Sequence, residues 1–407
     1  MITRPHGFFA QGTSVGIKPS GSPDLALIAS DRPAAAAGVF TTNRFPGAPV
    51  IIGKRHVRGG KAQAIVCNSG VSNVGTGRRG LDDARAMCGA AAEAINHAGL
   101  DVNRNTLTAS RVLPASTGVI GQPLPIDKIT AGIADLAGRL DRGGDADTAA
   151  AAAILTTDPR PKQAARTVEL STGVATLGGI AKGAGMIAPH MATMLAFITT
   201  DAEVDPRVLR RLTKAAAART FNRVSIDGDT STSDMVLVLA NAASRAACDS
   251  DAEVGAFAEA LDALCGDLAE QLVRDGEGVT RLMEVTVTGA ATVNDADRVG
   301  RAVVNSPLVK TALHGGDPNW GRLVMAVGKS GAKLRPASLT IRVGGITVLH
   351  GGEPTARTAD DQRGLEAAMQ REKVPMTLDL GLGEASATWL GCDLSRDYVG
   401  INADYTT

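Results

Sequence analysis

Threonine side chains gather in one segment of small residues, and a threonine hydroxyl can serve as a nucleophile. The segment covers residues 177–202 and holds Thr193, Thr199 and Thr200 among glycine, alanine and methionine residues. A threonine exposed as a new N-terminus can use its own α-amine, with an ordinary pKa of about 7.7 to 8.0, as general base. Small residues crowd the approach to Ala192 and Thr193, which leaves room for a substrate. The residue types alone do not choose among the three threonines.

Dinucleotide binding is an alternative for the same segment. Gly183–Ala188 fits the pattern G-x-G-x-x-A, follows a possible strand over Val174–Ile180, and precedes Glu203, which lies about twenty residues beyond the first glycine. The pattern places a pyrophosphate at the N-terminus of a helix. Pro189 stands where that helix should already be under way, so an oxidoreductase of this kind is the weaker interpretation.

Other motif-like patterns lack the context that their chemistry needs. Gly12–Gly16 matches G-x-S-x-G around Ser14, but a turn-like stretch over Ile17–Gly21 follows where a hydrolase has a helix. Gly328–Ser330 is similar to the end of a phosphate-binding loop, but Leu323 occupies the position of its first glycine. The six histidines show no paired-ligand spacing, and the five cysteines include no C-x-x-C pair. We therefore expect no metal site and no disulfide framework.

The residues around these motifs predict many short strands. Runs of apolar residues of strand length occur in both halves of the chain, and short runs of this kind suit buried strands. We expect strands at Leu25–Ala29, Val50–Ile52, Ala64–Val66, Val224–Ile226, Met235–Ala240, Met283–Thr288, Leu323–Val327 and Leu339–Val343.

Longer patterns between the strands predict helices. Asp205 followed by Pro206 is typical of an N-cap and first helical residue, and Gly99 would end the helix that precedes it. The expected helices are Leu81–Ala98, Pro206–Arg219 and Ala252–Arg274. We expect a linker-like segment at Gly143–Ala152 and a loop within Thr156–Arg166. This mixture predicts an α/β fold of mixed α+β layers.

The composition restricts the classes of partner. The chain has 407 residues, with 42 Lys and Arg against 42 Asp and Glu, so its formal net charge is zero. With this balance the chain has no net positive charge that would attract nucleic acid or an anionic membrane. Residues 183–200 contain no acid, lysine or arginine, but Pro189 and His190 argue against a membrane span there. No signal-peptide pattern opens the chain, and we expect a cytoplasmic protein.

Several long blocks resemble the ornithine acetyltransferase family, also called bifunctional glutamate N-acetyltransferase. They stand in the family's order along nearly the whole chain. The blocks are ASTGVIGQPLP from Ala115, TTDPRPK from Thr156, GIAKGAGMIAPHMATMLAF from Gly179, NRVSIDGDTSTSD from Asn222, DGEG from Asp275, NSPLVKTALHGGDPNWGR from Asn305 and GCDLSRDYVGINADYTT from Gly391.

The resemblance implies a self-cleaving enzyme with an N-terminal threonine nucleophile and two intertwined halves. Cleavage between Ala192 and Thr193 would give an α chain of residues 1–192, which carries the oxyanion hole, and a β chain of residues 193–407. Thr193 would then take the acetyl group of N2-acetylornithine and pass it to glutamate in a ping-pong reaction. The family implies an arginine-biosynthetic α2β2 heterotetramer without metal or organic cofactor, and acetyl-CoA is a possible co-substrate for making N-acetylglutamate.

The resemblance also assigns site residues. It implies an oxyanion hole at two adjacent residues, Thr117 and Gly118. A lysine can hold a substrate carboxylate and a glutamate can hold the ornithine ammonium group. The substrate-binding residues that it implies are Thr156, Lys182, Thr193, Glu277, Asn402 and Thr407.

Two departures from the family pattern leave the donor and acceptor open. The stretch Cys67–Asn73, which includes Val71, is less rich in asparagine than is usual, and His190 replaces the usual asparagine or acid. Thr193 is unchanged. A paralogue of specialised metabolism that acts on another acyl amino acid, or an aminopeptidase or amidase in which water resolves the ester, would use the same nucleophile.

Overall fold

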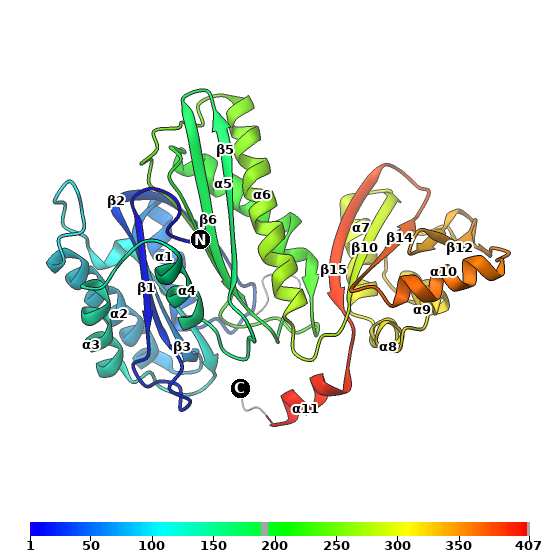
Figure 1. The fold of residues 1–407 in the computed structure, drawn as a ribbon, viewed down its shortest axis with the longest axis horizontal. Coiled ribbons are helices and arrows are strands. Elements are labelled where there is room, and N and C mark those ends of the chain that lie inside the picture. Colours follow the sequence, from blue (N-terminus) through cyan, green and yellow to red (C-terminus); the bar gives the residue numbers. More distant parts are fainter. Residues whose placement is uncertain (189–193, 405–407) are drawn as a thin grey trace.

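The chain folds into two units, each built around a β-sheet with helices packed on it (Figure 1). The structure is a computed structural model, and it describes residues 1–188 and 194–404. The N-terminal unit holds most of the first 280 residues, and the C-terminal unit holds most of the remainder. The expected mixed α/β class is confirmed.

The first sheet has eight strands among the described residues. The main path runs β4-β3-β2-β9-β7-β6-β5, and β1 pairs with β2 beside it. Its strands are β1 (Phe8–Thr13), β2 (Leu25–Phe40), β3 (Lys61–Val71), β4 (Val112–Val119), β5 (Lys162–Leu170), β6 (Gly173–Lys182), β7 (Leu195–Thr200) and β9 (Met235–Ala240).

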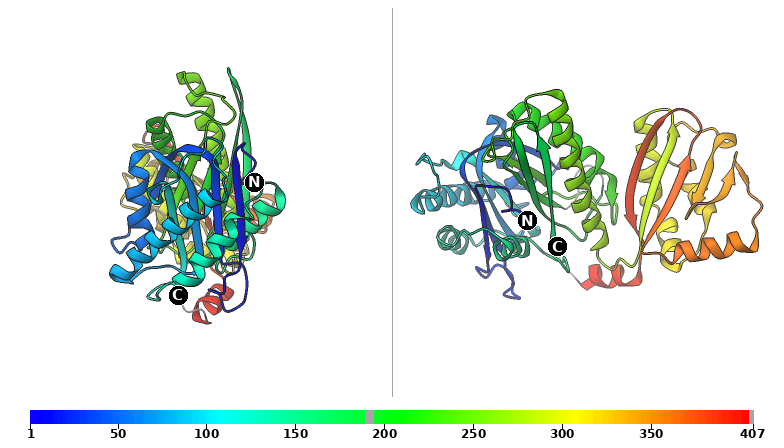
Figure 2. Two further views of the ribbon diagram at one scale, coloured as in Figure 1. Left: turned by 90° about the vertical axis from the view of Figure 1, so that its left-hand side faces the viewer. Right: turned by 45° about the horizontal axis from the view of Figure 1, so that its top comes forward.

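The long strand β2 divides this sheet into two halves that pack on each other. Its first part pairs with β1 and β3, its last part pairs with β9, and its register with β3 shifts between Ala29 and Ala34. Apolar residues of both halves share one core cluster, which includes Ile28 and Phe197. The outer face of one half packs on α1, α2 and α3, and that of the other half packs on α5 and α6 (Figure 2).

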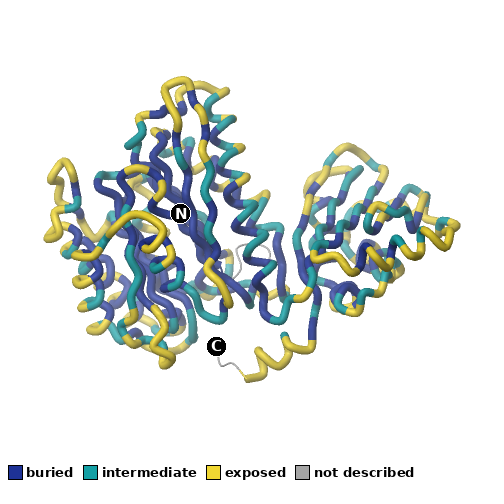
Figure 3. Tube along the Cα trace, viewed as in Figure 1, coloured by how far each residue is buried: buried dark blue, intermediate teal, exposed yellow. Residues whose placement is uncertain are grey.

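Strands β7 and β9 lie at the centre of this arrangement, and every residue of both is buried. Figure 3 shows buried segments running through the middle of the N-terminal unit. In β7, Phe197 faces the core between the sheet halves and Ile198 faces helix α6. The two strands run parallel, and parallel strands covered on both faces have continuous apolar sequences. The run Met235–Ala240, which predicted β9, has this character, whereas β7 was not among the expected strands.

Two helices of the N-terminal unit, α5 and α6, begin at side-chain caps. Asp205 accepts hydrogen bonds from Arg207 N and Val208 N at the start of α5, and Ser250 forms a capping box with Glu253 at the start of α6. The helices are α1 (Ala48–His56), α2 (Gly77–His97), α3 (Ile126–Ala137), α4 (Gly144–Ala153), α5 (Pro206–Arg219) and α6 (Asp251–Arg274).

The second sheet has seven strands among the described residues, in the order β13-β12-β11-β14-β10-β15-β8. Its strands are β8 (Val224–Ser225), β10 (Leu282–Ala290), β11 (Thr340–Val343), β12 (Ile346–His350), β13 (Glu353–Pro354), β14 (Lys373–Asp379) and β15 (Ala385–Cys392). The helices that accompany it are α7 (Val293–Val304), α8 (Pro307–Gly315), α9 (Trp320–Gly328) and α10 (Ala359–Met369).

The units are joined by the loop between α6 and β10, by strand β8 and by helix α11 (Arg396–Asp404). Strand β8 follows α5 in the chain but pairs with β15 of the second sheet. After β15 the chain returns toward the N-terminal unit as α11, seen in red beneath the two units in Figure 1. Among the described residues, no helix is both long enough and apolar enough to cross a lipid bilayer.

Three expected elements are wrong. Val50–Ile52 lies in α1, whose start carries Pro49, because a three-residue apolar run does not separate strand from helix. Leu323–Val327 lies in α9, where Leu323, Ala326 and Val327 follow helical spacing into the core. The expected linker Gly143–Ala152 is mostly α4, since its alanines favour helix and bury four side chains.

The other expected helices and strands are confirmed with small shifts of boundary. The helix predicted over Pro206–Arg219 has these bounds in the structure. The loop predicted over Thr156–Arg166 is present at residues 156–161 only, because residues 162–166 pair with β6 as part of β5. The expected cleavage position lies between β6 and β7, which are antiparallel neighbours. The two strands that follow residue 192, β9 and β7, therefore lie side by side between β2 and β6, which precede it.

Replacing Leu268 by alanine tests the packing of α6 on this sheet. Leu268 is fully buried, and its Cδ1 would lie 2.9 Å from a Cβ placed at Gly179 of β6, so the helix packs closely on the strand. We expect Leu268→Ala to lower the free energy of unfolding by about 2–5 kcal/mol and to lower the melting temperature. Leu308→Ala is the matched control because Leu308 is half exposed. Equal melting temperatures for the two variants would contradict this packing.

Candidate active site

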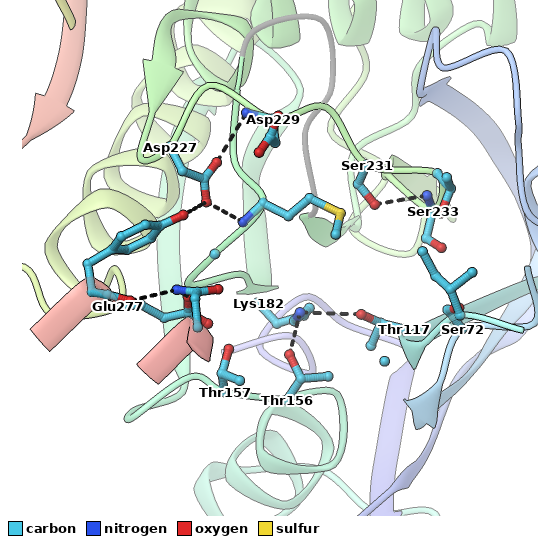
Figure 4. Close-up of a pocket in the computed structure, with 17 residues that line it drawn as sticks. Ser72, Thr117, Thr156, Thr157, Lys182, Asp227, Asp229, Ser231, Ser233 and Glu277 are labelled. Atoms are coloured by element: carbon cyan, nitrogen blue, oxygen red, sulfur yellow. Dashed lines mark hydrogen bonds between the residues drawn. The ribbon is translucent and has the colours of Figure 1, made fainter. Parts of the chain in front are cut away.

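A cavity of about 250 Å³ lies where the N-terminal unit, the loop after α6 and helix α11 meet (Figure 4). Most of its lining side chains are polar. The lining residues are Ser72, Thr117, Gly118, Ile120, Thr156, Thr157, Lys182, Gly185, Met186, Asp227, Asp229, Ser231, Thr232, Ser233, Glu277, Tyr398 and Asn402.

The structure brings six of the expected site residues together in this cavity. They come from β4, from the loop before β5, from the end of β6, from the loop after α6 and from α11. The six are Thr117, Gly118, Thr156, Lys182, Glu277 and Asn402. Thr193, Ala192 and Thr407 lie outside the described residues, and so does His190.

Lys182, the last residue of β6, is fully buried and organises one side of the cavity. Its Nζ donates to Thr156 Oγ1 at 2.8 Å and to Thr117 Oγ1 at 3.3 Å. A threonine hydroxyl that accepts a hydrogen bond keeps its own proton to donate. The Thr117 hydroxyl is therefore available as a donor to an oxygen atom in the cavity.

Gly118 requires glycine for two independent reasons. Its φ is +127°, in the range that residues with a side chain rarely adopt. A Cβ on this residue would also lie 2.3 Å from the carbonyl carbon of Gly70 in the neighbouring strand β3. The β3–β4 register shifts at Gly70 and Val71. This irregular end of β4 faces the cavity, where backbone N–H groups can stabilise an oxyanion.

Glu277 also lines the cavity, and hydrogen bonds to Ala184 and Asn402 hold it in place. Its N–H donates to the Ala184 carbonyl at 2.9 Å, and its Oε2 accepts from Asn402 Nδ2 at 2.8 Å. A Cβ at Gly185 would lie 2.4 Å from Glu277 Oε2. Glycine at 185 thus makes room for a carboxylate.

This contact also explains Gly185, the second glycine of the dinucleotide-like pattern. Residues 183–188 are not helical, and strand β7 begins at Leu195. A dinucleotide fold needs a helix directly after the glycines. The geometry therefore gives no support to the oxidoreductase alternative.

Asp227 and Tyr398 are site residues that the sequence analysis missed. Asp227 accepts hydrogen bonds from Met186 N at 2.6 Å, Ile187 N at 2.9 Å and the Tyr398 hydroxyl at 3.3 Å. Met186 has a φ of +54°, so these bonds hold a strained backbone in place. Burial raises the pKa of Asp227, and burial together with the Asp227 charge raises the pKa of Tyr398. Both lie in blocks that resemble the family, which was the available signal.

Asp234 anchors the chain directly after the undescribed segment. Its Oδ1 accepts from Met194 N at 2.8 Å. Its Oδ2 is buried without a hydrogen-bond partner among the described residues, and burial raises the pKa of Asp234 well above its usual range. Leu195, the next residue, pairs with Lys182 across β6 and β7. Leu195 therefore lies beside Lys182, a residue that lines the cavity.

The family model and the curated relatives indicate one family. The ArgJ family matches residues 9–407. The arginine biosynthesis bifunctional protein ArgJ of Symbiobacterium thermophilum is 46% identical over 410 residues, which cover 100% of this chain and 98% of that protein. The protein of the same name from Thermosynechococcus vestitus is 43% identical over 425 residues, with the same coverage. A solved structure of ArgJ from Bacillus halodurans is 40% identical, with a TM-score of 0.48, and covers 51% of this chain and 97% of the solved one.

The buried carboxyl group of Asp234 predicts a pH-dependent stability. Because its pKa is raised in the folded state, the folded protein keeps a proton that the unfolded chain loses, and stability falls as pH rises above about 4. An asparagine does not titrate. We expect the melting temperature of Asp234→Asn, relative to the unmodified protein, to increase between about pH 5 and pH 8. The exposed Asp229→Asn is the control, and a constant difference for Asp234→Asn would contradict the prediction.

Proposed function

The chain belongs to the ArgJ family, and from this premise we propose that it transfers the acetyl group of N2-acetylornithine to glutamate. The observation that carries the proposal is the presence of one charge of each sign in one small cavity. Lys182 and Glu277 both line it. A donor with a carboxylate and an ammonium group fits such a site, with the lysine at the carboxylate and the glutamate at the ammonium.

The proposed reaction has two steps through a threonine ester. The Oγ of Thr193 attacks the acetyl carbonyl carbon, the C–N bond to ornithine breaks, and the proton lost by Oγ passes to the departing amine. The amine of glutamate then attacks the ester carbonyl and restores the free hydroxyl. Thr117 and the Gly118 N–H would stabilise the oxyanion in both steps, each by about 3 to 4 kcal/mol.

In this proposal the general base is the α-amine of Thr193, which requires cleavage between Ala192 and Thr193. The products would be an α chain of residues 1–192 and a β chain of residues 193–407, assembled as an α2β2 heterotetramer. The order β2-β9-β7-β6 supports the two-chain proposal, since interleaved strands would hold the pieces together. The transfer would need no metal and no organic cofactor, and acetyl-CoA would enter only as a second acetyl donor.

Intact mass spectrometry tests the proposal directly. The purified protein should give two masses that correspond to residues 1–192 and 193–407. Brief incubation with N2-acetylornithine should add one acetyl group to the larger fragment, and glutamate should remove it. An intact chain without an adduct would contradict the proposal. Rapid loss of the adduct in water without glutamate would favour an amidase or aminopeptidase, and an adduct from another acyl amino acid would identify a different donor.

The variant Thr193→Ala should remain a single chain of 407 residues and lose transfer, because both events use the same hydroxyl. The measurement is the mass of the purified variant together with its rate of ornithine release. Thr199→Ala provides a matched control, since the Thr199 hydroxyl donates to the Ile2 carbonyl at 2.6 Å within the sheet. Transfer that survives in Thr193→Ala would remove Thr193 from the mechanism.

The variant Glu277→Gln should raise KM for N2-acetylornithine about tenfold or more and leave self-cleavage intact. The amide keeps the size of the side chain and its contact with Asn402, but it loses the charge that would pair with the substrate ammonium. Steady-state kinetics with both substrates measure the effect. Glu384→Gln, on an exposed loop, is the control. Loss of self-cleavage in Glu277→Gln would assign Glu277 to folding instead.

A further inference from the structure

Asp158 is a buried carboxylate that does not line the cavity but stands directly behind two residues that do. It lies in the loop between α4 and β5, two residues after Thr156. Its side chain is fully buried. A charge in that position needs charged or hydrogen-bonding partners.

The two oxygen atoms of Asp158 contact different parts of the site. Oδ2 accepts from Thr156 N at 3.0 Å and Thr156 Oγ1 at 3.5 Å, and lies 3.7 Å from the ammonium of Lys182. Oδ1 accepts from Lys162 Nζ at 2.6 Å and from Gly183 N at 2.5 Å. One carboxylate therefore ties the loop of Thr156 to the end of β6.

The contacts extend into a set of four buried charges of alternating sign. Lys162 Nζ also lies 2.5 Å from Asp275 Oδ2, and Asp275 accepts from the backbone N–H of Arg160. The set Lys182, Asp158, Lys162 and Asp275 has no net charge. Pairing with opposite charges offsets the free-energy cost of burying each ion. Removing one partner destabilises the folded protein, because the other charge stays buried without a partner.

Asp158 is ionised at neutral pH. Burial acts to raise the pKa of its carboxyl group, but the nearby charges of Lys182 and Lys162 hold that pKa well below its usual range. A full negative charge thus faces the Lys182 ammonium from the side away from the cavity. The ammonium donates to Thr156 and Thr117, and because Asp158 Oδ2 at 3.7 Å lies beyond hydrogen-bond distance, its third N–H remains for a substrate carboxylate.

We propose that Asp158 is a positioning residue of the acyl-transfer site: it fixes the Lys182 ammonium in the orientation that receives the substrate carboxylate, directly and through the Thr156 hydroxyl, which donates to Asp158 and accepts from Lys182. This inference rests on the proposed function, in which Lys182 binds that carboxylate. Through Lys182 the same contact orients the Thr117 hydroxyl, which lies at the proposed oxyanion position.

If Asp158 only neutralised Lys162, removing both charges together would restore KM along with the melting temperature. A pair of variants distinguishes this structural role from the proposed one. Asp158→Asn alone leaves Lys162 underpaired and should lower both the melting temperature and substrate affinity. The double variant Asp158→Asn with Lys162→Met removes one charge of each sign, so it should recover much of the melting temperature. Its KM for N2-acetylornithine should stay raised at least about tenfold, because Lys182 still lacks its carboxylate.

The single variant Lys162→Met is the matched control. It removes a buried charge from the same set but leaves Asp158 beside Lys182. We expect a lower melting temperature with a KM close to that of the unmodified protein. A double variant with normal KM, or a Lys162→Met variant with KM raised as much as in Asp158→Asn, would overturn the inference.

A second measurement is independent of activity. The Lys182 ammonium can be followed in ¹H–¹⁵N spectra of lysine side chains, with its signal assigned by its absence in Lys182→Met. In both the Asp158→Asn and the double variant this signal should shift or vanish through exchange with water, whereas in Lys162→Met it should persist. An unchanged Lys182 signal in the double variant would overturn the inference. Absence of transfer by the unmodified protein would instead contradict the proposed function, and the spectra would still decide whether Asp158 holds Lys182.

Discussion

An ammonium group removed from water must be surrounded by oxygen atoms, and the buried Lys182 imposes this requirement on the site. Its partners Thr117, Thr156 and Asp158 come from the end of β4 and from the loop before β5. These elements can converge only because the two halves of the first sheet pack face to face and bring β4 near the end of β6. The polar contacts of Lys182 therefore depend on the apolar packing between the two sheet halves.

Local signals predicted the elements whose ends are set by neighbouring residues. Helix α5 begins at Asp205 and Pro206 because a side-chain cap and a fixed φ act within one turn. The short runs at Val50–Ile52 and Leu323–Val327 could not be assigned in this way, since burial on a helix and burial in a strand need the same apolar residues. The pairing of β2 with β9 joins segments about two hundred residues apart, and no local pattern specifies it.

The candidate site was predictable only through the resemblance of long blocks to a known family. Taken singly, Lys182 and Glu277 are ordinary charged residues, and spacing along the chain does not bring them together. Asp158 and Asp227 were missed because their significance depends on burial and on backbone N–H groups that only the folded chain directs at them. Gly118 and Gly185 are visible in the sequence as glycines, but only the folded structure shows the close contacts that require glycine there.

Helix α11 carries Tyr398 and Asn402 to the cavity from the end of the second unit, and their partners Asp227 and Glu277 lie far earlier in the chain. On the ribosome, Lys182, Thr117 and Glu277 are all synthesised well before helix α11, which completes the lining of the cavity. The cavity therefore stays open on one side until the residues up to 402 have emerged and β15 has paired with β10. Any chemistry that needs the closed cavity is delayed by the order of synthesis until the second unit has folded.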